Sequence, residues 1–529
     1  MNEYELGTIV SGSLSQGFLM RINPQYDVEE LKSGRFVSIQ GAHTTFFSLL
    51  TDIRLDPIPN YTTFAYPERK SIAHEVIQAI ACSAHATIRP LIALTHDKQI
   101  TPVKSIPKHF APVLPATNQD IAYIFGSEHQ TPGKVFAIGK PLDMHADVCI
   151  DLEKFTERSS GVFGKTGTGK TFITRLLLAG LLKHQRATCL IFDMHSEYGL
   201  QARNENSNAP FVKGLKTLFP AQSAIFSLDP QATRRRGGNP DICLTIPLQS
   251  ISVGDILALS TELNLHPTAC EAAYLLAARY KKDWLIQLLD RGNQAAELAQ
   301  EIGAHAESIA ALYRKLRIIE RFPFFTRSNQ GLQSPIQTLM EHLERDLSVI
   351  IEFGTYSSTF CYLLLANIIT RRIHAQYIEK TEQFLASQHP EDEPKKLLIV
   401  IEEAHKFLNP AAAQQTIFGT IAREMRKYYV SLMIVDQRPS GIDPEILSQI
   451  GTKFIAQLHD EKDISAVLCG IAGAQELKTV LATLSSKQQA LVLGHAITTP
   501  IVIETRRYDE NFYATLAHTA DAKKINQLF

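Results

Sequence analysis

Gly164-Lys165-Thr166-Gly167-Thr168-Gly169-Lys170-Thr171 is the stretch of this sequence that decides the fold. It follows the apolar run 161–163, which is typical of a strand, and it precedes a run with leucines at helical spacing. A G-x-x-x-x-G-K-[ST] pattern between a strand and a helix is a P-loop. Its small residues allow backbone N–H groups to surround phosphates, and the helix N-terminus adds a partial positive charge. We therefore predict that residues 164–171, with the flanking Phe172, bind ATP.

Two residues at the end of this loop carry the chemistry of a nucleotide site. Lys170 is expected to neutralise the β- and γ-phosphates, and Thr171 is expected to ligate Mg²⁺. A glycine-rich turn without a ligand would not explain a lysine and a threonine at these two positions. ATP and Mg²⁺ are therefore the predicted cofactors.

A second acidic signal follows the apolar run 397–401, which has the composition of a buried strand. Glu402 and Glu403 come directly after it, and a buried strand that ends in two acids is the Walker B arrangement. We predict that Glu402 holds the metal ion and that Glu403 polarises the attacking water. Two exposed acids at a strand end are the alternative interpretation.

Another acid, Asp193, ends the apolar run 189–192. It is expected at the carboxyl edge of a parallel sheet, where ligands bind in open α/β folds. A polar role near the nucleotide is the favoured interpretation. A structural turn and a metal site formed with His195 and Glu197 are the alternatives.

Two arginines and a glutamine complete the candidate site. Arg423 and Arg426 are three residues apart and are expected to share one helix face. They are interpreted either as arginine fingers that reach the ATP of a neighbouring subunit or as partners in salt bridges along the helix. Gln437, at the tip of the next predicted strand, suits a sensor of the γ-phosphate or of the attacking water.

The chain of 529 residues divides by pattern into several segments. Short strand-like runs broken by Gly, Pro and Asp predict a small β-barrel in residues 1–145, with a possible helix at 72–81. Continuous apolar strands alternating with helices predict a parallel sheet covered on both faces, in residues 146–245 and 331–505. Residues 246–330 are expected to form a helical insertion. The fold class is therefore α/β, with a barrel before the core and helices inserted into it.

Composition adds limits. Apolar residues make up 45% of the chain, charged residues 20%, and the net charge is −1. Overall charge therefore does not indicate a nucleic-acid binder, although local Lys and Arg suffice to contact phosphates. The one dense basic run, 234–236, is either a solvated loop or a phosphate contact. The sequence contains no C-x-x-C pair, and its cysteines are predicted to be mainly buried free thiols. No signal or membrane segment is recognised. A cytoplasmic location is therefore predicted.

Together these motifs resemble the HerA family, within the HerA–FtsK branch of P-loop motors. Several segments are similar to family patterns in the family's order: 193–198 to D-P-H-G-E-Y, 402–405 to E-E-A-H, 421–427 to I-A-R-E-G-R-K, and 436–449 to S-Q-R-P-S…D-P…L-S-Q. Four residues depart from these patterns: Met194 replaces Pro, Ser196 and Met425 replace Gly, and Asp436 replaces Ser.

The resemblance implies a RecA-like core behind a HerA-type barrel, and a hexameric ring with ATP sites between subunits. It also implies translocation along double-stranded DNA and a partner nuclease or other effector, in DNA end processing or antiphage defence. It favours Arg423 and Arg426 as residues that act across the subunit interface. Residues 506–529 are expected to brace a neighbouring subunit.

Two other functions compete with a DNA translocase. An ATPase ring could instead hold and gate an effector enzyme without moving DNA. A protein-secretion ATPase of the type IV kind shares the motor core, but the absence of a recognised membrane segment and the N-terminal barrel argue against it.

Overall fold

The computed structural model describes residues 5–55, 84–97, 99–203, 211–327, 335–356, 358–415, 417–471, 474–485 and 488–516. The predicted helix at 72–81 lies outside these residues, as do residues 517–529 of the predicted brace. The chain forms two compact units. Unit 1 comprises residues 1–155, 162–170 and 451–507, and unit 2 comprises residues 156–161, 171–450 and 508–529.

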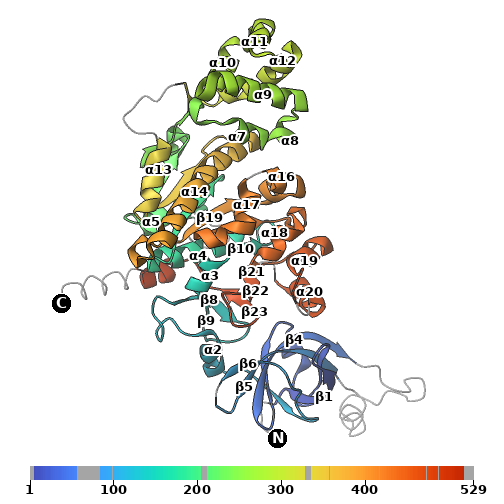
Figure 1. Ribbon diagram of the computed structural model, residues 1–529. Coiled ribbons are helices and arrows are strands. Elements are labelled where there is room, and N and C mark those ends of the chain that lie inside the picture. Colours follow the sequence, from blue (N-terminus) through green and yellow to red (C-terminus); the bar gives the residue numbers. More distant parts are fainter. Residues whose placement is uncertain are drawn as a thin grey trace, which may run out of the picture. The chain divides into compact units, whose positions relative to one another are not determined.

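A closed antiparallel barrel occupies the N-terminal part of unit 1 (Figure 1). Its strand order is β2-β1-β7-β3-β4-β5, and a β2–β5 pairing closes the ring, with β6 added beyond β5. The strands are β1 (Gly7–Ser13), β2 (Gly17–Ile22), β3 (Phe36–Gln40), β4 (Thr44–Leu55), β5 (Ala84–Thr95), β6 (Ile100–Pro102) and β7 (Pro112–Pro115), with a 3₁₀ turn η1 (Val28–Glu30) after β2. Closure leaves few unpaired strand edges.

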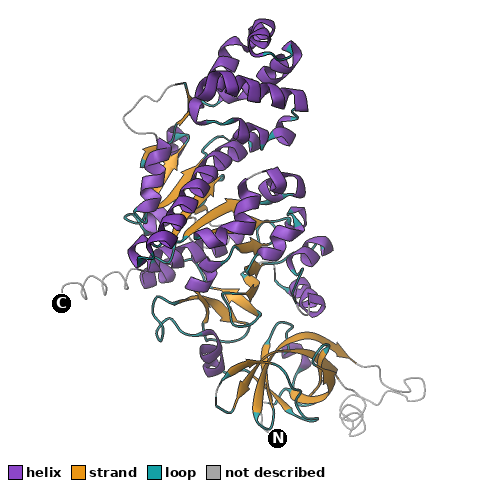
Figure 2. Cartoon of the chain, in the orientation of Figure 1, coloured by secondary structure: helices purple, strands orange, loops and turns teal. Residues whose placement is uncertain are grey.

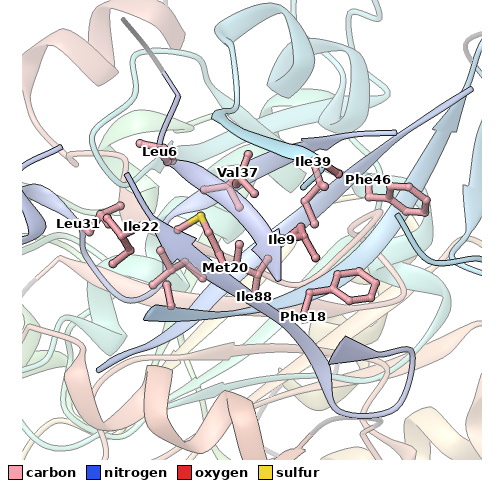
Figure 3. Close-up of a cluster of buried hydrophobic side chains, with 14 of the residues drawn as sticks. Leu6, Ile9, Phe18, Met20, Ile22, Leu31, Val37, Ile39, Phe46 and Ile88 are labelled. Atoms are coloured by element: carbon pink, nitrogen blue, oxygen red, sulfur yellow. The ribbon is translucent and has the colours of Figure 1, made fainter. Parts of the chain in front are cut away.

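Alternating side chains of these strands fill the barrel. Ile9, Met20, Val37 and Ile88 come from four different strands and meet in its core (Figure 3). Because successive residues of a strand point to opposite faces, short strands with apolar residues at every second position are sufficient to form this core.

The rest of unit 1 is a mainly antiparallel sheet in the order β10-β21-β22-β23-β8-β9. Its elements are α2 (Asn118–Phe125), β8 (Val135–Pro141), β9 (Val148–Asp151), α3 (Leu152–Glu157), β10 (Ser160–Phe163), β21 (Thr452–Ile455), α19 (Glu461–Val467), α20 (Ala474–Thr483), β22 (Gln489–Gly494) and β23 (Ile501–Thr505). The predicted barrel boundary at residue 145 falls between β8 and β9, which pair with each other in this second sheet.

Unit 2 contains a parallel sheet in the order β15-β14-β18-β11-β19-β20. Its strands are β11 (Thr188–Asp193), β14 (Ser223–Ser227), β15 (Ile242–Cys243), β18 (Ser348–Glu352), β19 (Leu397–Glu402) and β20 (Val430–Asp436). Two short pairs, β12 (Gln201–Arg203) with β13 (Phe211–Lys213) and β16 (Ile246–Pro247) with β17 (Phe325–Thr326), lie outside this sheet.

Helices of unit 2 flank these parallel strands or pack on the helices that do (Figures 1 and 2). They include α4 (Lys170–His184), α5 (Leu215–Leu218), α6 (Pro230–Arg235), α13 (Pro335–Glu344), α14 (Thr359–Ser387), α15 (His405–Leu408), α16 (Pro410–Gln415), α17 (Ile417–Glu424) and α18 (Pro444–Gln449). All side chains from Ile173 to Leu182 of α4 are buried, which explains its nearly uniform apolar sequence.

The helical insertion predicted at 246–330 contains α7 (Val253–Leu257), α8 (Ser260–Leu263), α9 (Pro267–Tyr280), α10 (Trp284–Arg291), α11 (Ala295–Ile302) and α12 (Ala306–Leu316). Pro267 occupies the first turn of α9, where its missing N–H costs no hydrogen bond. The side chains Ile309, Leu312, Leu316 and Ile319 follow one another at helical spacing and are all buried, so they form an apolar stripe in the core of the insertion.

These elements confirm the predicted fold class: a RecA-like P-loop α/β core with an N-terminal small β-barrel and a helical insertion. The prediction for the cysteines holds only in part, because Cys149, Cys189 and Cys361 are buried whereas Cys243 and Cys469 are exposed. Among the helices of the described residues, none combines the length and apolar character needed to cross a membrane.

Candidate nucleotide site

The glycine-rich loop of unit 1 begins where β10 ends. Gly167 and Gly169 have φ angles of 80° and 92°, which L side chains rarely adopt, so glycine is required at both positions. A Cβ on Gly164 would lie 2.7 Å from Thr168 Oγ1. The side chains of Thr168 and Lys170 both donate to the carbonyl oxygen of Lys165, at 2.7 and 2.8 Å. The loop thus curls around the Lys165 carbonyl, with Lys165, Thr166 and Gly167 exposed.

The helix that follows this loop, α4, begins at Lys170 and places Thr171 and Phe172 in its first turn, both half-buried. One turn later Arg175 is 1% exposed. Its guanidinium lies 5.6 Å from the Phe172 ring centroid and donates to the backbone carbonyl of Glu197. This contact ties the start of α4 to the loop after β11.

Acidic residues end four neighbouring parallel strands of unit 2. They are Glu352 of β18, Asp193 of β11, Glu402 of β19 and Asp436 of β20. All four are at most 7% exposed. Because the strands are parallel, these residues share the carboxyl edge of the sheet, as predicted for Asp193. The sequence analysis did not single out Glu352, and it noted Asp436 only as a departure from the family pattern.

Asp193 organises the loop that follows it. Its carboxylate accepts hydrogen bonds from the backbone N–H groups of Glu197 (2.8 Å), Tyr198 (2.9 Å) and Gly199 (3.3 Å). Burial raises the pKa of Asp193 to about 7, although these N–H donors oppose the shift. Of the interpretations considered for Asp193, a structural turn matches these contacts most directly. His195 is exposed, and the described residues contain no group of three or more His, Cys, Asp or Glu arranged to hold a metal.

Glu402 has two carboxylate oxygens in different environments. Oε1 accepts from the Tyr198 hydroxyl at 2.8 Å, whereas buried Oε2 has no hydrogen-bond partner within the described part of the chain. Burial, with the nearby Asp193 carboxylate, raises the pKa of Glu402 to about 8. A buried carboxylate oxygen without a donor suits a cation. The first Walker B acid therefore has the chemistry expected of a metal ligand.

Glu403 differs from its neighbour. Its φ is 50°, in the left-handed region that non-glycine residues rarely occupy, and its side chain is 22% exposed. Its Oε1 accepts from Gln437 Nε2 at 2.8 Å. The structure therefore brings together the predicted water-polarising acid and the predicted sensor.

A histidine–aspartate pair lies next to this glutamate. Asp436 accepts from the backbone N–H of His405 at 2.7 Å and lies 3.0 Å from its Nδ1. The hydrogen bond to Asp436 raises the pKa of His405. Glu403 Oε2 is 3.8 Å from the same Nδ1, so His405 lies between two carboxylates. Asp436 ends an apolar strand, and this is the sequence signal that could have identified it.

The basic run at 234–236 is divided in the structure. Arg236 forms an ion pair of 2.6 Å with the 1%-exposed Glu352, and Thr233 Oγ1 donates to the same oxygen at 2.8 Å. Arg234 and Arg235 are exposed at the end of α6. Both interpretations of the basic run are therefore wrong for Arg236, whose guanidinium pairs with a buried carboxylate.

The two arginines predicted as fingers do not lie on one continuous α-helix. α17 ends at Glu424, and Arg426 belongs to the 3₁₀ turn η7 (Met425–Tyr428). Arg423 donates to the carbonyl of Ala413 at 3.2 Å and lies 3.9 Å from exposed Glu445. Arg426 is exposed.

The sequence is similar to proteins of one family. A family model described as the central domain of the helicase HerA matches residues 136–373. The DNA double-strand break repair helicase HerA of Pyrococcus furiosus is 22% identical over 389 residues, which cover 68% of this chain and 67% of the relative. A probable helicase of Methanocaldococcus jannaschii is 23% identical over 417 residues, covering 77% and 72%.

Two solved structures are also similar to this chain. VirB4 of Thermoanaerobacter pseudethanolicus is 15% identical, with a TM-score of 0.46, and the match covers 71% of this chain and 97% of VirB4. The bacterial conjugative coupling protein TrwB is 12% identical, with the same TM-score, over 74% of this chain and 93% of TrwB.

Proposed function

Because the chain belongs to the HerA family, whose relatives are helicases, we propose that this ATP hydrolase moves along double-stranded DNA. One observation supports the proposed site of ATP hydrolysis most strongly: two adjacent acidic residues at the end of β19 lie in contrasting environments. Glu402 is buried with one unpaired oxygen, and Glu403 is partly exposed and bonded to Gln437. Adjacent carboxylates in different surroundings can take different roles.

The residues around the phosphates have the following proposed roles. Residues 164–169 bind the phosphates through backbone N–H groups, and Lys170 exchanges its contact with the Lys165 carbonyl for the β- and γ-phosphate oxygens. Phe172 and Asp193 support the start of α4 and the loop after β11, rather than contacting the phosphates directly.

The water-activating group in this proposal is Glu403. Its carboxylate polarises the attacking water, and Gln437, donating at 2.8 Å, fixes its orientation. The strained backbone of Glu403 is consistent with a functional position, since left-handed φ angles at non-glycine residues concentrate at active sites.

Mg²⁺ fits the residues present. Thr171 and Glu402 would hold it, and the unpaired Oε2 of Glu402 is the observation that favours this assignment. Mg²⁺ at nucleotide sites is held by one or two protein groups together with phosphates and waters, so a cluster of three acids is not required. When bound, the ion neutralises charge that develops on the phosphates.

We propose that the chain works as a ring, a homohexamer, in which Arg423 or Arg426 reaches the ATP of a neighbouring subunit. Both side chains are exposed, and the weak contacts of Arg423 at 3.2 and 3.9 Å can be exchanged for a phosphate. Subunits that carry Arg423→Ala should partly recover ATP hydrolysis when mixed with Lys170→Ala subunits. Absence of recovery at every mixing ratio would contradict a role across the interface.

A nuclease or another effector is the proposed partner, in DNA end processing or antiphage defence, in a cytoplasmic setting. The alternative is an ATPase ring that holds and gates an effector without moving DNA. Duplex DNA should stimulate ATP hydrolysis by the wild-type protein, and the stimulated protein should displace a triplex-forming strand from the duplex. ATP hydrolysis that is indifferent to DNA, but altered by a co-purified effector, would favour the scaffold.

A further inference from the structure

A basic groove lies within unit 2, between the helical insertion and the start of α14. Its volume is about 850 Å³. It is lined by the last turn of α12, by the 3₁₀ turn η5 (Arg317–Arg321) and by residues 358–360. The charged residues of its lining are Glu262, Arg314, Lys315, Arg317, Glu320 and Arg321.

Most of the positive charge in this groove is not neutralised. Arg314, Lys315 and Arg321 are exposed, and no residue in the described ranges forms an ion pair with any of them. Glu320 is already engaged by Arg327 at 3.0 Å, and its distance to Arg317 is 4.0 Å. In a chain with a net charge of −1, this concentration of cations is local.

The start of α14 adds hydrogen-bond donors to the same groove. This helix is 29 residues long, and the side chain of its N-cap residue, Ser358, makes no capping hydrogen bond. The first backbone N–H groups of such a helix have no partner within it, and they favour anions. The hydroxyl groups of Ser358 and Thr359 line the groove beside them.

We propose that this groove binds the phosphate backbone of duplex DNA. Arg, Lys, hydroxyl groups and helix N-termini are the donors that contact DNA phosphates. Single strands, by contrast, are held by stacking of bases on exposed aromatic rings. The two aromatic residues of the groove do not offer such surfaces, since Phe360 is buried and the Tyr313 ring packs against Gly292. The inference rests on the proposed function and deepens it, because it assigns the DNA a contact surface.

The groove is also tied to the carboxylate edge of the sheet. Residues 353–356, which follow Glu352, are held by two contacts: the Thr355 hydroxyl donates to Asp229 at 2.6 Å, and the Tyr356 ring centroid lies 5.2 Å from that of Phe324. Glu352 in turn lies opposite Asp193 in the β11–β18 register. A ligand in the groove therefore lies near a segment that leads to the carboxyl edge of the parallel sheet in unit 2.

The test compares two double variants of the full-length protein. Arg314→Ala/Lys315→Ala removes two cations from the groove. Lys281→Ala/Lys282→Ala removes two exposed cations from the same helical insertion but outside the groove, and it serves as the matched control. Binding of a fluorescent duplex is measured by anisotropy over a range of salt concentrations, and ATP hydrolysis is measured with and without duplex.

For the groove variant we expect duplex binding at least about tenfold weaker at moderate salt. The slope of log affinity against log salt should fall in magnitude by about 2, since each lost phosphate contact removes about 0.9. Stimulation of hydrolysis by DNA should fall in parallel, while hydrolysis without DNA stays at the wild-type rate. The control variant should match the wild-type protein in all four readouts.

Three outcomes would overturn the inference. If the groove variant binds duplex with the wild-type slope while the wild-type protein is stimulated by DNA, the groove is wrong and the proposed function stands. If the wild-type protein neither binds duplex nor responds to it, both fail. If polyaspartate binds the wild-type protein and this binding, but not duplex binding, is lost in the groove variant, the groove takes an acidic protein segment instead.

Discussion

The hydroxyl group of Tyr198 provides a sensitive test of the candidate metal ligand. It is buried, it donates to Glu402 Oε1 at 2.8 Å, and it leaves Oε2 as the unpaired oxygen. Tyr198→Phe removes this donor and almost nothing else. Glu402 then loses its one side-chain partner, is free to rotate, and is harder to ionise, because the lost hydrogen bond favoured the charged form.

The size of the effect follows from the type of bond. A hydrogen bond to a charged group contributes about 1.5–3 kcal/mol, which corresponds to about a tenfold to hundredfold change in an equilibrium constant. Loss of a group that orients a metal ligand costs about 10–100-fold in metal affinity or activity. We therefore expect the Mg²⁺ concentration for half-maximal ATP hydrolysis to rise by about tenfold or more.

The assay is a titration of steady-state phosphate release against Mg²⁺ at fixed ATP. Tyr362→Phe is the matched control, because it also removes a buried tyrosine hydroxyl that bonds to Glu402, but to the backbone carbonyl, at 3.3 Å. The control should leave the Mg²⁺ midpoint unchanged. An unchanged midpoint for Tyr198→Phe, in a protein with a normal urea unfolding midpoint, would refute the reasoning.

Three further predictions concern stability and are checked by urea unfolding. Ser196 has a φ of 56° where the family pattern has glycine, so Ser196→Gly should stabilise the protein by about 0.5 kcal/mol. A lower urea unfolding midpoint for this variant would show that the serine side chain contributes more than the backbone strain costs. The pKa of His405 is raised by Asp436, so this pair stabilises the fold below the ordinary histidine pKa and the contribution is lost as pH rises through the raised value. From about pH 6 to about pH 8, the wild-type protein should therefore lose stability relative to Asp436→Asn, and parallel profiles would contradict this. Burial lowers the pKa of Lys453 to about 8, so above that pH the unfolded chain binds more protons than the folded protein. The wild-type protein should therefore gain stability relative to Lys453→Met as the pH rises above about 8. Equal pH dependence of the two proteins would argue against a buried amine.

The sequence predicted those parts of the site in which a short local pattern is enough to specify the local structure. The spacing of glycines before Lys170, and two acids after an apolar run, specify a loop and a strand end without reference to the rest of the chain. Parallel strands then bring Asp193 and Glu402 to one edge, which is also a general rule.

The remaining features depend on partners far apart in the sequence. Glu352 and Arg236 are 116 residues apart, so no local pattern in the sequence indicates that they pair. Tyr198 and Glu402 are 204 residues apart. The polar run that begins at residue 383 has the composition of a surface linker, yet its first residues form the end of α14, because tertiary contacts along the earlier turns extend the helix.

The most direct test of the central claim compares nucleotide binding and hydrolysis in Glu403→Gln. Binding of a fluorescent ATP analogue should stay within the wild-type range, because the glycine-rich loop and Lys170 are intact. Phosphate release should fall by about 100-fold or more, as expected when a general base is lost. Phosphate release at the wild-type rate would contradict the assignment of Glu403, and loss of analogue binding would contradict the separation of binding from hydrolysis.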